Sequence, residues 1–280
     1  MEDLIIGCST NYDWSKIKYW INSINKSGFT GKKVMILMNC DHATAEKVLE
    51  AGFEIISFDN DGNGNLTHQS QFMVHVERFL HIYNYLSANK FRNVITTDVK
   101  DVIFQYDPFP ELDSRLKLSG KDLVFSSESM KYKDEPWGNQ NLLETYGPYI
   151  YSKFKDNVIY NVGVLSGKSD AIRDLCLNIF LAAIGRPIKI CDQSTFNVMI
   201  NMHPYTEVSL YTKSEDGWAC QLGTTADPSK IDQFKPFLLE KSPKLLGDQV
   251  VTNETELPYS IVHQYDRVPE WRKIIEEKYE

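Results

Sequence analysis

Residues 91–109, FRNVITTDVKDVIFQYDPF, decide how the rest of the chain is interpreted. A β-favouring run, VITT, ends at Asp98, and a second acidic residue follows at Asp101. Acidic side chains just past the end of a buried strand lie where open α/β sheets bind their ligands. Two carboxylates at such a place suit a hard divalent cation, which takes oxygen ligands. A solvated turn is the alternative interpretation, because a bare D-x-x-D pattern is a weak motif.

Length and composition limit the class of protein. The chain has 280 residues, of which 42% are hydrophobic and 24% charged, so it can bury a sizeable core. Its formal net charge of −8 and the absence of a Lys/Arg block argue against nucleic acid or an anionic membrane as the main partner. The five cysteines are scattered without a C-x-x-C pair, which is typical of reduced core thiols. With no signal peptide and no long apolar run, we expect a soluble cytoplasmic protein without a transmembrane segment.

Strand-like and helix-like segments alternate from the start of the chain. Continuous apolar runs indicate strands at 4–10, 34–38 and 53–58, and helical spacing of apolar residues indicates a helix at 14–24. A short helix is expected at 43–51, closed by Gly52 at a position where helices often end. This order predicts an α/β fold with a mostly parallel sheet and helices on both faces. The clearest helix covers 70–86, and Arg78 lies well off its apolar face, where an exposed cation is expected.

The second half of the chain is less regular. A strand at 123–125 leads into Glu128, and residues 129–158 are expected to form an irregular but ordered insertion around Trp137, because they are rich in aromatic residues. The elements expected after it are a strand at 158–165, helices at 169–184 and 192–199, a strand at 261–263 and a last helix at 271–279. Because no repeat and no interdomain linker is visible, one domain is the simplest account.

Four short motifs, in this order, resemble those of GT-A glycosyltransferases, metal-dependent enzymes that move a sugar from a nucleoside diphosphate. They are VITTD at 94–98 with DP at 107–108, YNVGV at 160–164, DQ at 192–193 followed by Asn197, and IVHQYD at 261–266. The chain is most similar to the glycogenin-like group (family 8) and to plant and large-virus nucleotide-diphospho-sugar transferases. The resemblance implies one GT-A (Rossmann-like) domain over 1–280, with a nucleotide-binding half at about 1–110 and an acceptor half at about 111–280.

The resemblance also implies a site for Mn²⁺ or Mg²⁺. Asp98 matches the first carboxylate of the family's D-x-D element, but Lys100 stands where the second would be, and Asp101 comes one residue later. We expect Asp101 to ligate the metal directly, and Asp98 to bind the metal, the ribose, or both. His263 matches the position of the third ligand, and an ordinary core histidine is the alternative.

Further matched positions imply the site for a nucleotide-sugar donor, most readily a UDP-sugar. The implied donor-binding residues are Ser9, Thr10, Tyr12, Arg78, Asp98, Asn161 and Gly163. Asp192 and Gln193 match a pair beside the anomeric carbon, although Asp192 is also a candidate helix N-cap. The family 8 likeness implies retention of anomeric configuration. If the enzyme inverts instead, it needs a general base, for which Glu128 and Asp192 are the candidates.

The implied acceptor is a glycan or a glycoprotein. Trp137 is a candidate to stack on the acceptor sugar through its apolar face. The stretch WACQLGTTAD at 218–227 is a candidate mobile lid, with Gly223 as hinge and hydroxyls of Thr224 and Thr225 for the diphosphate; an ordinary surface loop is the alternative.

Two other functions remain open at this point. A nucleotide-sugar hydrolase or nucleotidyltransferase predicts a Gly-rich phosphate loop after the first strand, which the turn GCSTN at 7–11 lacks. A catalytically inactive sugar-nucleotide-binding module is compatible with Lys100 in the acidic element.

Overall fold

A seven-stranded sheet crosses the molecule in the order β10-β8-β9-β6-β1-β2-β3. The computed structural model describes all residues from 1 to 280. The strands of this sheet are β1 (Leu4–Ser9), β2 (Lys32–Leu37), β3 (Glu54–Ile56), β6 (Asn93–Thr97), β8 (Leu123–Lys131), β9 (Val158–Lys168) and β10 (Ser209–Thr212). Strand β9 runs antiparallel to both of its neighbours, and all other neighbouring pairs are parallel. The expected mixed, mostly parallel α/β sheet is therefore confirmed.

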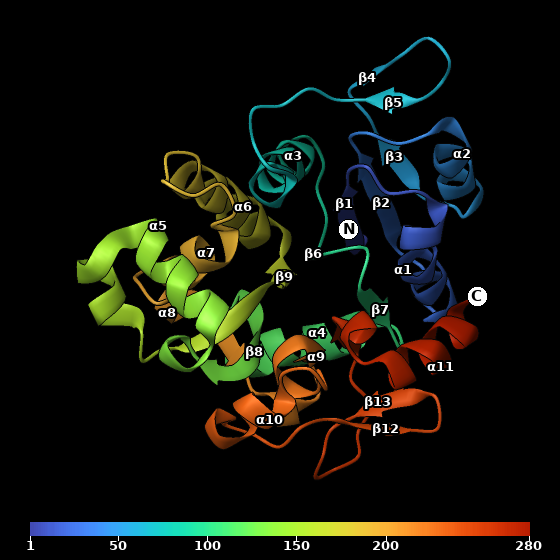
Figure 1. Cartoon of the computed structure of the whole chain (residues 1–280). Helices are drawn as coiled ribbons and strands as arrows, with labels where there is room; N and C mark the ends of the chain where they lie inside the picture. Colours follow the sequence, from blue (N-terminus) through green and yellow to red (C-terminus); the bar gives the residue numbers. More distant parts are fainter.

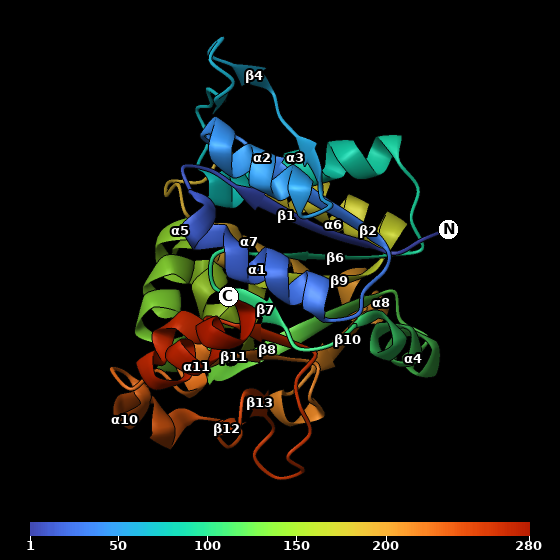
Figure 2. The same cartoon turned by 90° about the vertical axis from the view of Figure 1, so that its right-hand side faces the viewer.

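Helices cover both faces of this sheet (Figures 1 and 2). One face is covered by α3 (Val74–Ala88), α6 (Ser169–Ala183) and α7 (Asp192–Ile200), and the other by α1 (Trp14–Lys26), α2 (His42–Glu50) and α4 (Phe109–Ser119). The helices form where apolar residues recur at helical spacing; in α3, for example, Val76, Phe79, Ile82 and Leu86 enter the core. Each such fully buried side chain stabilises the fold by about 1.5–3 kcal/mol.

A small second sheet brings the late part of the chain beside the acidic stretch. Its order is β11-β14-β7, formed by β7 (Val102–Phe104), β11 (Ala219–Gln221) and β14 (Ile261–His263). Strand β14 is antiparallel to β7, in a register that places His263 opposite Val102. The last helix, α11 (Pro269–Tyr279), packs on α1, where Asn22 Nδ2 donates to the carbonyl of Tyr279 at 2.8 Å.

Residues 129–158 are not irregular, so that prediction was wrong. They form the end of β8, a 3₁₀ turn (Tyr132–Asp134) and α5 (Pro136–Phe154). The Glu135 carboxylate caps α5 by accepting from the amides of Trp137 and Gly138. Gly147, with φ of 74°, and Pro148 interrupt the helical backbone, and this interruption conceals the helical period in the sequence.

The remaining elements are short. They are the hairpin β4 (Asp59–Asn60) and β5 (Leu66–Thr67), the helices α8 (Tyr205–Val208), α9 (Leu222–Thr225) and α10 (Ile231–Phe234), and the hairpin β12 (Lys244–Leu246) and β13 (Gln249–Val251). The β4–β5 hairpin stands out at the top of both views (Figures 1 and 2). All five cysteines are free and buried, as expected. No helix combines the length and apolar character that a membrane span requires.

Candidate active site

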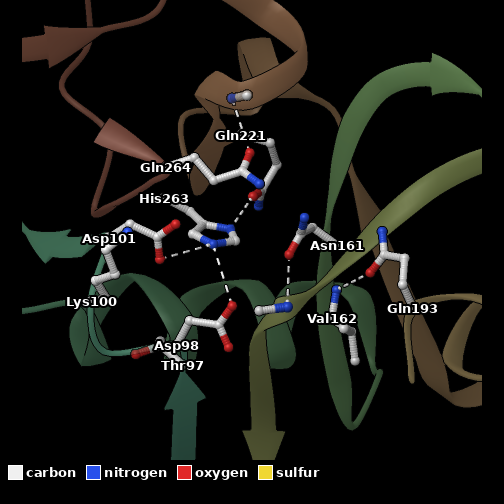
Figure 3. Close-up of polar contacts among 12 residues, drawn as sticks. Thr97, Asp98, Lys100, Asp101, Asn161, Val162, Gln193, Gln221, His263 and Gln264 are labelled. Carbon is white, nitrogen blue, oxygen red and sulfur yellow. Dashed lines mark hydrogen bonds and ion pairs between the residues drawn. The ribbon is translucent and has the colours of Figure 1, made fainter. Parts of the chain in front are cut away.

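Three side chains from separate parts of the chain meet beyond the carboxyl end of β6 (Figure 3). Asp98 directly follows β6, Asp101 directly precedes β7, and His263 ends β14. Nε2 of His263 lies 3.6 Å from Oδ2 of Asp98 and 3.6 Å from Oδ1 of Asp101. One potential ligand atom from each residue falls within 4.8 Å of the other two. The structure thus brings together the three residues expected to bind a metal.

The orientation of the His263 ring is set by Gln221, at the end of β11. Nδ1 of His263 lies 2.7 Å from Oε1 of Gln221, and Nε2 of Gln221 donates to Ser126 Oγ at 2.8 Å. Because the Gln221 amide nitrogen is occupied by Ser126, its carbonyl faces Nδ1, which must carry the proton. Nε2 then faces the two aspartates, where a metal ion would take the place of a proton, which is the usual arrangement of a metal-binding histidine.

The donor set fits a divalent cation. Burial alone would raise the pKa of Asp101, but the neighbouring His263 and Arg267 hold the pKa of this carboxyl below its ordinary value. Two carboxylates and one imidazole match the preferences of Mn²⁺ or Mg²⁺. Lys100, which stands where the resemblance would place a second aspartate, pairs with Asp266, at 3.3 Å from Nζ to Oδ2.

Arg78 connects this trio to Asp192. The guanidinium contacts the Asp98 carboxylate and donates from Nη2 to Oδ2 of Asp192 at 3.2 Å. The alternative of an exposed Arg78 is wrong: the residue is 8% exposed, because two carboxylates offset the cost of burying its charge. The N-cap alternative for Asp192 is also wrong, since Cys191 occupies that position and the Asp192 carboxylate is directed to Arg78.

Glu128, Asn161 and Gln193 form a second hydrogen-bonded network in the site. Oε1 of Glu128 accepts from Nδ2 of Asn161 at 2.7 Å and from Nε2 of Gln193 at 2.6 Å. The amide oxygens of Gln193 and Asn161 accept from backbone N–H groups of β9, so both amides have a fixed orientation. Burial raises the pKa of Glu128 to about 7, with a further contribution from the nearby Glu135.

The backbone is unusual next to these side chains. Ser129, which follows Glu128, and Gln264, which follows His263, both have left-handed conformations, with φ of 57° and 60°. Such conformations are costly for non-glycine residues and gather at functional sites. A Cβ atom on Gly163 would lie 2.6 Å from His263 and 2.8 Å from Asp98, so only glycine fits there.

Two cavities meet at the trio. The larger, of about 500 Å³, is lined by Glu128, Trp137, Asn161, Gly163, Asp192 and Gln193, among others. The smaller, of about 260 Å³, is lined by Ser9, Thr10, Tyr12, Lys100 and Asp101, among others. Arg78, Asp98 and His263 line both. The hydroxyl of Ser9 and Nε of Arg78 are buried without a hydrogen-bond partner, which a ligand in these cavities would supply.

The stretch at 218–227 does not have the structure of a mobile lid. It forms β11 and α9, and every residue from 218 to 225 is buried. The hydroxyl of Thr224 donates to the carbonyl of Glu128 at 2.8 Å, and that of Thr225 to the carbonyl of Gln221 at 2.7 Å. Both hydroxyls are therefore engaged by the protein backbone. Of this stretch, Gly223, Thr224 and Asp227 line the larger cavity.

Sequence reasoning missed several residues in and around the site. Gln221 has no motif of its own, because its role depends on the pairing of β11 with β14. Gln264 lies within the IVHQYD motif, and its Oε1 accepts from the Gly223 amide at 2.9 Å (Figure 3). His75, one turn before Arg78 on α3, lines both cavities, and its helical spacing from Arg78 was the available signal.

Comparisons with known proteins give the fold. No family model and no curated protein sequence matches the chain. Among solved structures, the apo structure of WbbM, described as a bifunctional glycosyltransferase, is similar to 98% of this chain, with a TM-score of 0.60 and 10% sequence identity. The chain spans about half of that protein, 51% of its length. The likeness and the sheet order together show that this chain has a glycosyltransferase fold of the GT-A, Rossmann-like type.

Proposed function

We propose that the protein is a metal-dependent glycosyltransferase that moves a sugar from a nucleoside diphosphate sugar, most readily a UDP-sugar, to a glycan or glycoprotein. The observation that carries the proposal is the meeting of two cavities at Asp98, Asp101 and His263. A transferase needs one space for the nucleoside and one for the sugar and its acceptor, with the diphosphate between them. The smaller cavity is lined mainly by residues before position 110, which supports a nucleotide-binding half at about 1–110 and an acceptor half at about 111–280.

The residues of the smaller cavity are assigned to the nucleoside. Ser9 ends β1, and Thr10 and Tyr12 follow it at the carboxyl edge of the sheet, where open α/β folds bind ligands. The unpartnered hydroxyl of Ser9 is available to a ribose or base. Arg78 is placed to stabilise negative charge on the departing diphosphate, and such electrostatic stabilisation is usually the largest catalytic effect. A divalent cation held by the trio would supply further positive charge at the same place.

Asn161, Gly163, Asp192 and Gln193 are assigned to the transferred sugar. In the reaction the anomeric carbon gains a bond to the acceptor oxygen, the diphosphate leaves with the electron pair of the broken bond, and the acceptor gives up its proton. The fixed amides of Asn161 and Gln193 can orient the sugar hydroxyls. Asp192 holds Arg78 and lines the space beside them.

Retention is the proposed stereochemical outcome, as the family resemblance implies. One observation favours inversion as the second candidate. A pKa of about 7 makes Glu128 suitable as a general base near neutral pH, whereas Asp192 is engaged by Arg78. The anomeric configuration of the product, followed by NMR from the first minutes of the reaction, distinguishes the two outcomes.

Turnover of a panel of nucleotide sugars, with and without Mn²⁺, tests the proposal. We expect Mn²⁺-dependent transfer to an added acceptor, lost in Asp101→Ala. Asp113→Ala is the matched control, because Asp113 forms a surface ion pair with Arg92 away from the cavities. Release of nucleoside diphosphate without transfer to any acceptor would instead support a hydrolase. Tight binding without turnover would support an inactive binding module, and an unchanged Mn²⁺ response in Asp101→Ala would reject the metal assignment.

A further inference from the structure

A second group of possible metal ligands lies on α3 and the segment that leads into it. His68 follows β5, and Glu77 and His81 lie one helical turn apart on α3. One potential ligand atom from each residue falls within 4.8 Å of the other two. None of the three belongs to the trio of the active site, and neither of the two cavities described above is lined by them.

Both imidazoles are directed at the same carboxylate oxygen. Nε2 of His68 lies 2.8 Å from Oε1 of Glu77, and Nε2 of His81 lies 3.4 Å from that oxygen. The three side chains are 15%, 7% and 10% exposed in the order His68, Glu77, His81. Ligands of a tetrahedral zinc ion are separated by about 3.3 Å, given metal–ligand distances near 2 Å. The cluster therefore needs only a small rearrangement to surround one ion.

A bound cation would account for two features of the cluster. Nε2 of His81 is buried and, although it lies 3.4 Å from the Glu77 carboxylate, it makes no hydrogen bond of good geometry. The buried carboxylate of Glu77 forms no ion pair with any lysine or arginine; its ion pairs are with the two histidines. A buried carboxylate is costly unless it is paired or coordinates a metal. Phe58 packs against both imidazole rings, with centroids 4.5 Å from His68 and 4.3 Å from His81, and holds them in place.

We propose that His68, Glu77 and His81 bind a transition-metal ion, Zn²⁺ by preference, with water as the fourth ligand. Two imidazoles and one carboxylate suit zinc and its borderline-soft neighbours, whereas the carboxylate-rich trio of the active site suits Mn²⁺ or Mg²⁺. Glu77 also borders a shallow surface hollow lined by residues 69–72 and Leu80, which gives the ion a route to the site. The ion fastens the segment after the β4–β5 hairpin to α3, the helix that carries Arg78.

Titration of the tag-free full chain with Co²⁺, followed by visible absorption, tests the proposal, with Zn²⁺ as competitor. The background is Asp98→Asn/Asp101→Asn, which weakens the active-site trio. We expect one Co²⁺ per chain, displaced by Zn²⁺, and an affinity lowered by at least about tenfold in each of His68→Ala, Glu77→Gln and His81→Ala. The matched control is His203→Ala, which removes an exposed histidine that also faces a glutamate one turn away, Glu207, at 3.5 Å.

The thermal midpoint, measured in EDTA and then with Zn²⁺, provides a second readout. The background protein should gain stability with Zn²⁺, and Glu77→Gln should lose this gain while keeping its midpoint in EDTA. Glu77→Gln decides the question if either histidine variant fails to fold, because it preserves side-chain shape. Absence of Co²⁺ and Zn²⁺ binding in the background protein would overturn the proposal. Equal loss of binding in His203→Ala and His81→Ala would also overturn it, because the ion would then bind surface histidines.

Discussion

Gln221 is the residue through which the candidate metal site is oriented. Its carbonyl accepts from Nδ1 of His263, so that Nε2 faces the aspartates. We expect Gln221→Leu to weaken Mn²⁺ binding by about 10–100-fold, because the ring loses the partner that fixes its tautomer. Isothermal titration with Mn²⁺ measures the effect. Gln105→Leu is the control: this glutamine is also buried, but its amide bonds the backbone of Val250 and Tyr259, so stability should fall while Mn²⁺ affinity persists.

Glu128 makes the stability of the metal-free protein depend on pH. Its pKa rises from an ordinary 4.5 in the unfolded chain to about 7 in the fold. The unfolded chain therefore releases this proton first, and stability falls as pH rises from about 4.5 to 7. Glu128→Gln should remove this loss, worth about 3 kcal/mol across the window.

Urea unfolding of wild type and Glu128→Gln in EDTA, at several pH values, measures this difference. Glu50→Gln, on the exposed end of α2, is the surface control. A constant difference between wild type and Glu128→Gln across the window would show that Glu128 ionises in the fold as it does in the unfolded chain.

At the scale of the element, α5 presents Trp137 to the larger cavity. The indole lies in the first turn of α5, is 54% exposed and lines the larger cavity but not the smaller one. We expect Trp137→Ala to raise the acceptor KM by roughly 2- to 10-fold, since an aromatic stacking contact contributes about 0.5–1.5 kcal/mol. Donor hydrolysis in the absence of acceptor should change little.

Tyr149→Ala is the matched control for this variant. Tyr149 is an exposed aromatic residue in the second part of α5 that does not line the cavity, so the acceptor KM should stay at the wild-type value. A collapse of donor binding in Trp137→Ala would place this turn of α5 on the nucleotide instead of the acceptor.

The segment formed by β11 and α9 should behave as part of the core. Residues 218–225 are buried, and both threonine hydroxyls already have backbone partners. Amide hydrogen exchange across this segment should therefore be slow without ligand, and UDP with Mn²⁺ should change it little. A large decrease in exchange on adding the nucleotide would instead support the mobile lid that the sequence suggested for residues 218–227.

For the whole molecule, the sequence predicted the sheet well because its strands are continuous apolar runs between turn residues. The helices α1, α3 and α11 were expected from the spacing of their apolar residues, and helices were also expected at α2, α6 and α7. The structure departs from the prediction where tertiary contacts override local pattern. Gly147 and Pro148 concealed α5. The two carboxylates that offset the burial of Arg78 come from outside α3: Asp98 directly follows β6, and Asp192 lies on α7.

In the candidate site, too, the features that depend on tertiary contacts were missed. The approach of Asp98, Asp101 and His263 was expected from motifs that resemble a family, since no local pattern connects residues so far apart. Gln221 and the αL conformation of Gln264 depend on the register of β11, β14 and β7, which a single sequence does not contain. The cluster of His68, Glu77 and His81 was missed because only the path of the chain after β5 brings His68 to α3.

The position of β14 between β11 and β7 has a consequence for how the protein is made. The ribosome synthesises Asp98 and Asp101 long before His263, so the candidate metal site is incomplete during most of the synthesis of the chain. Pairings between residues so distant in sequence also form slowly, because closing a long loop costs entropy. Mn²⁺ binding should therefore be among the last properties to return during refolding. In a stopped-flow experiment, the Mn²⁺ signal should lag behind the far-UV circular dichroism signal, because β14 pairs with β7 late.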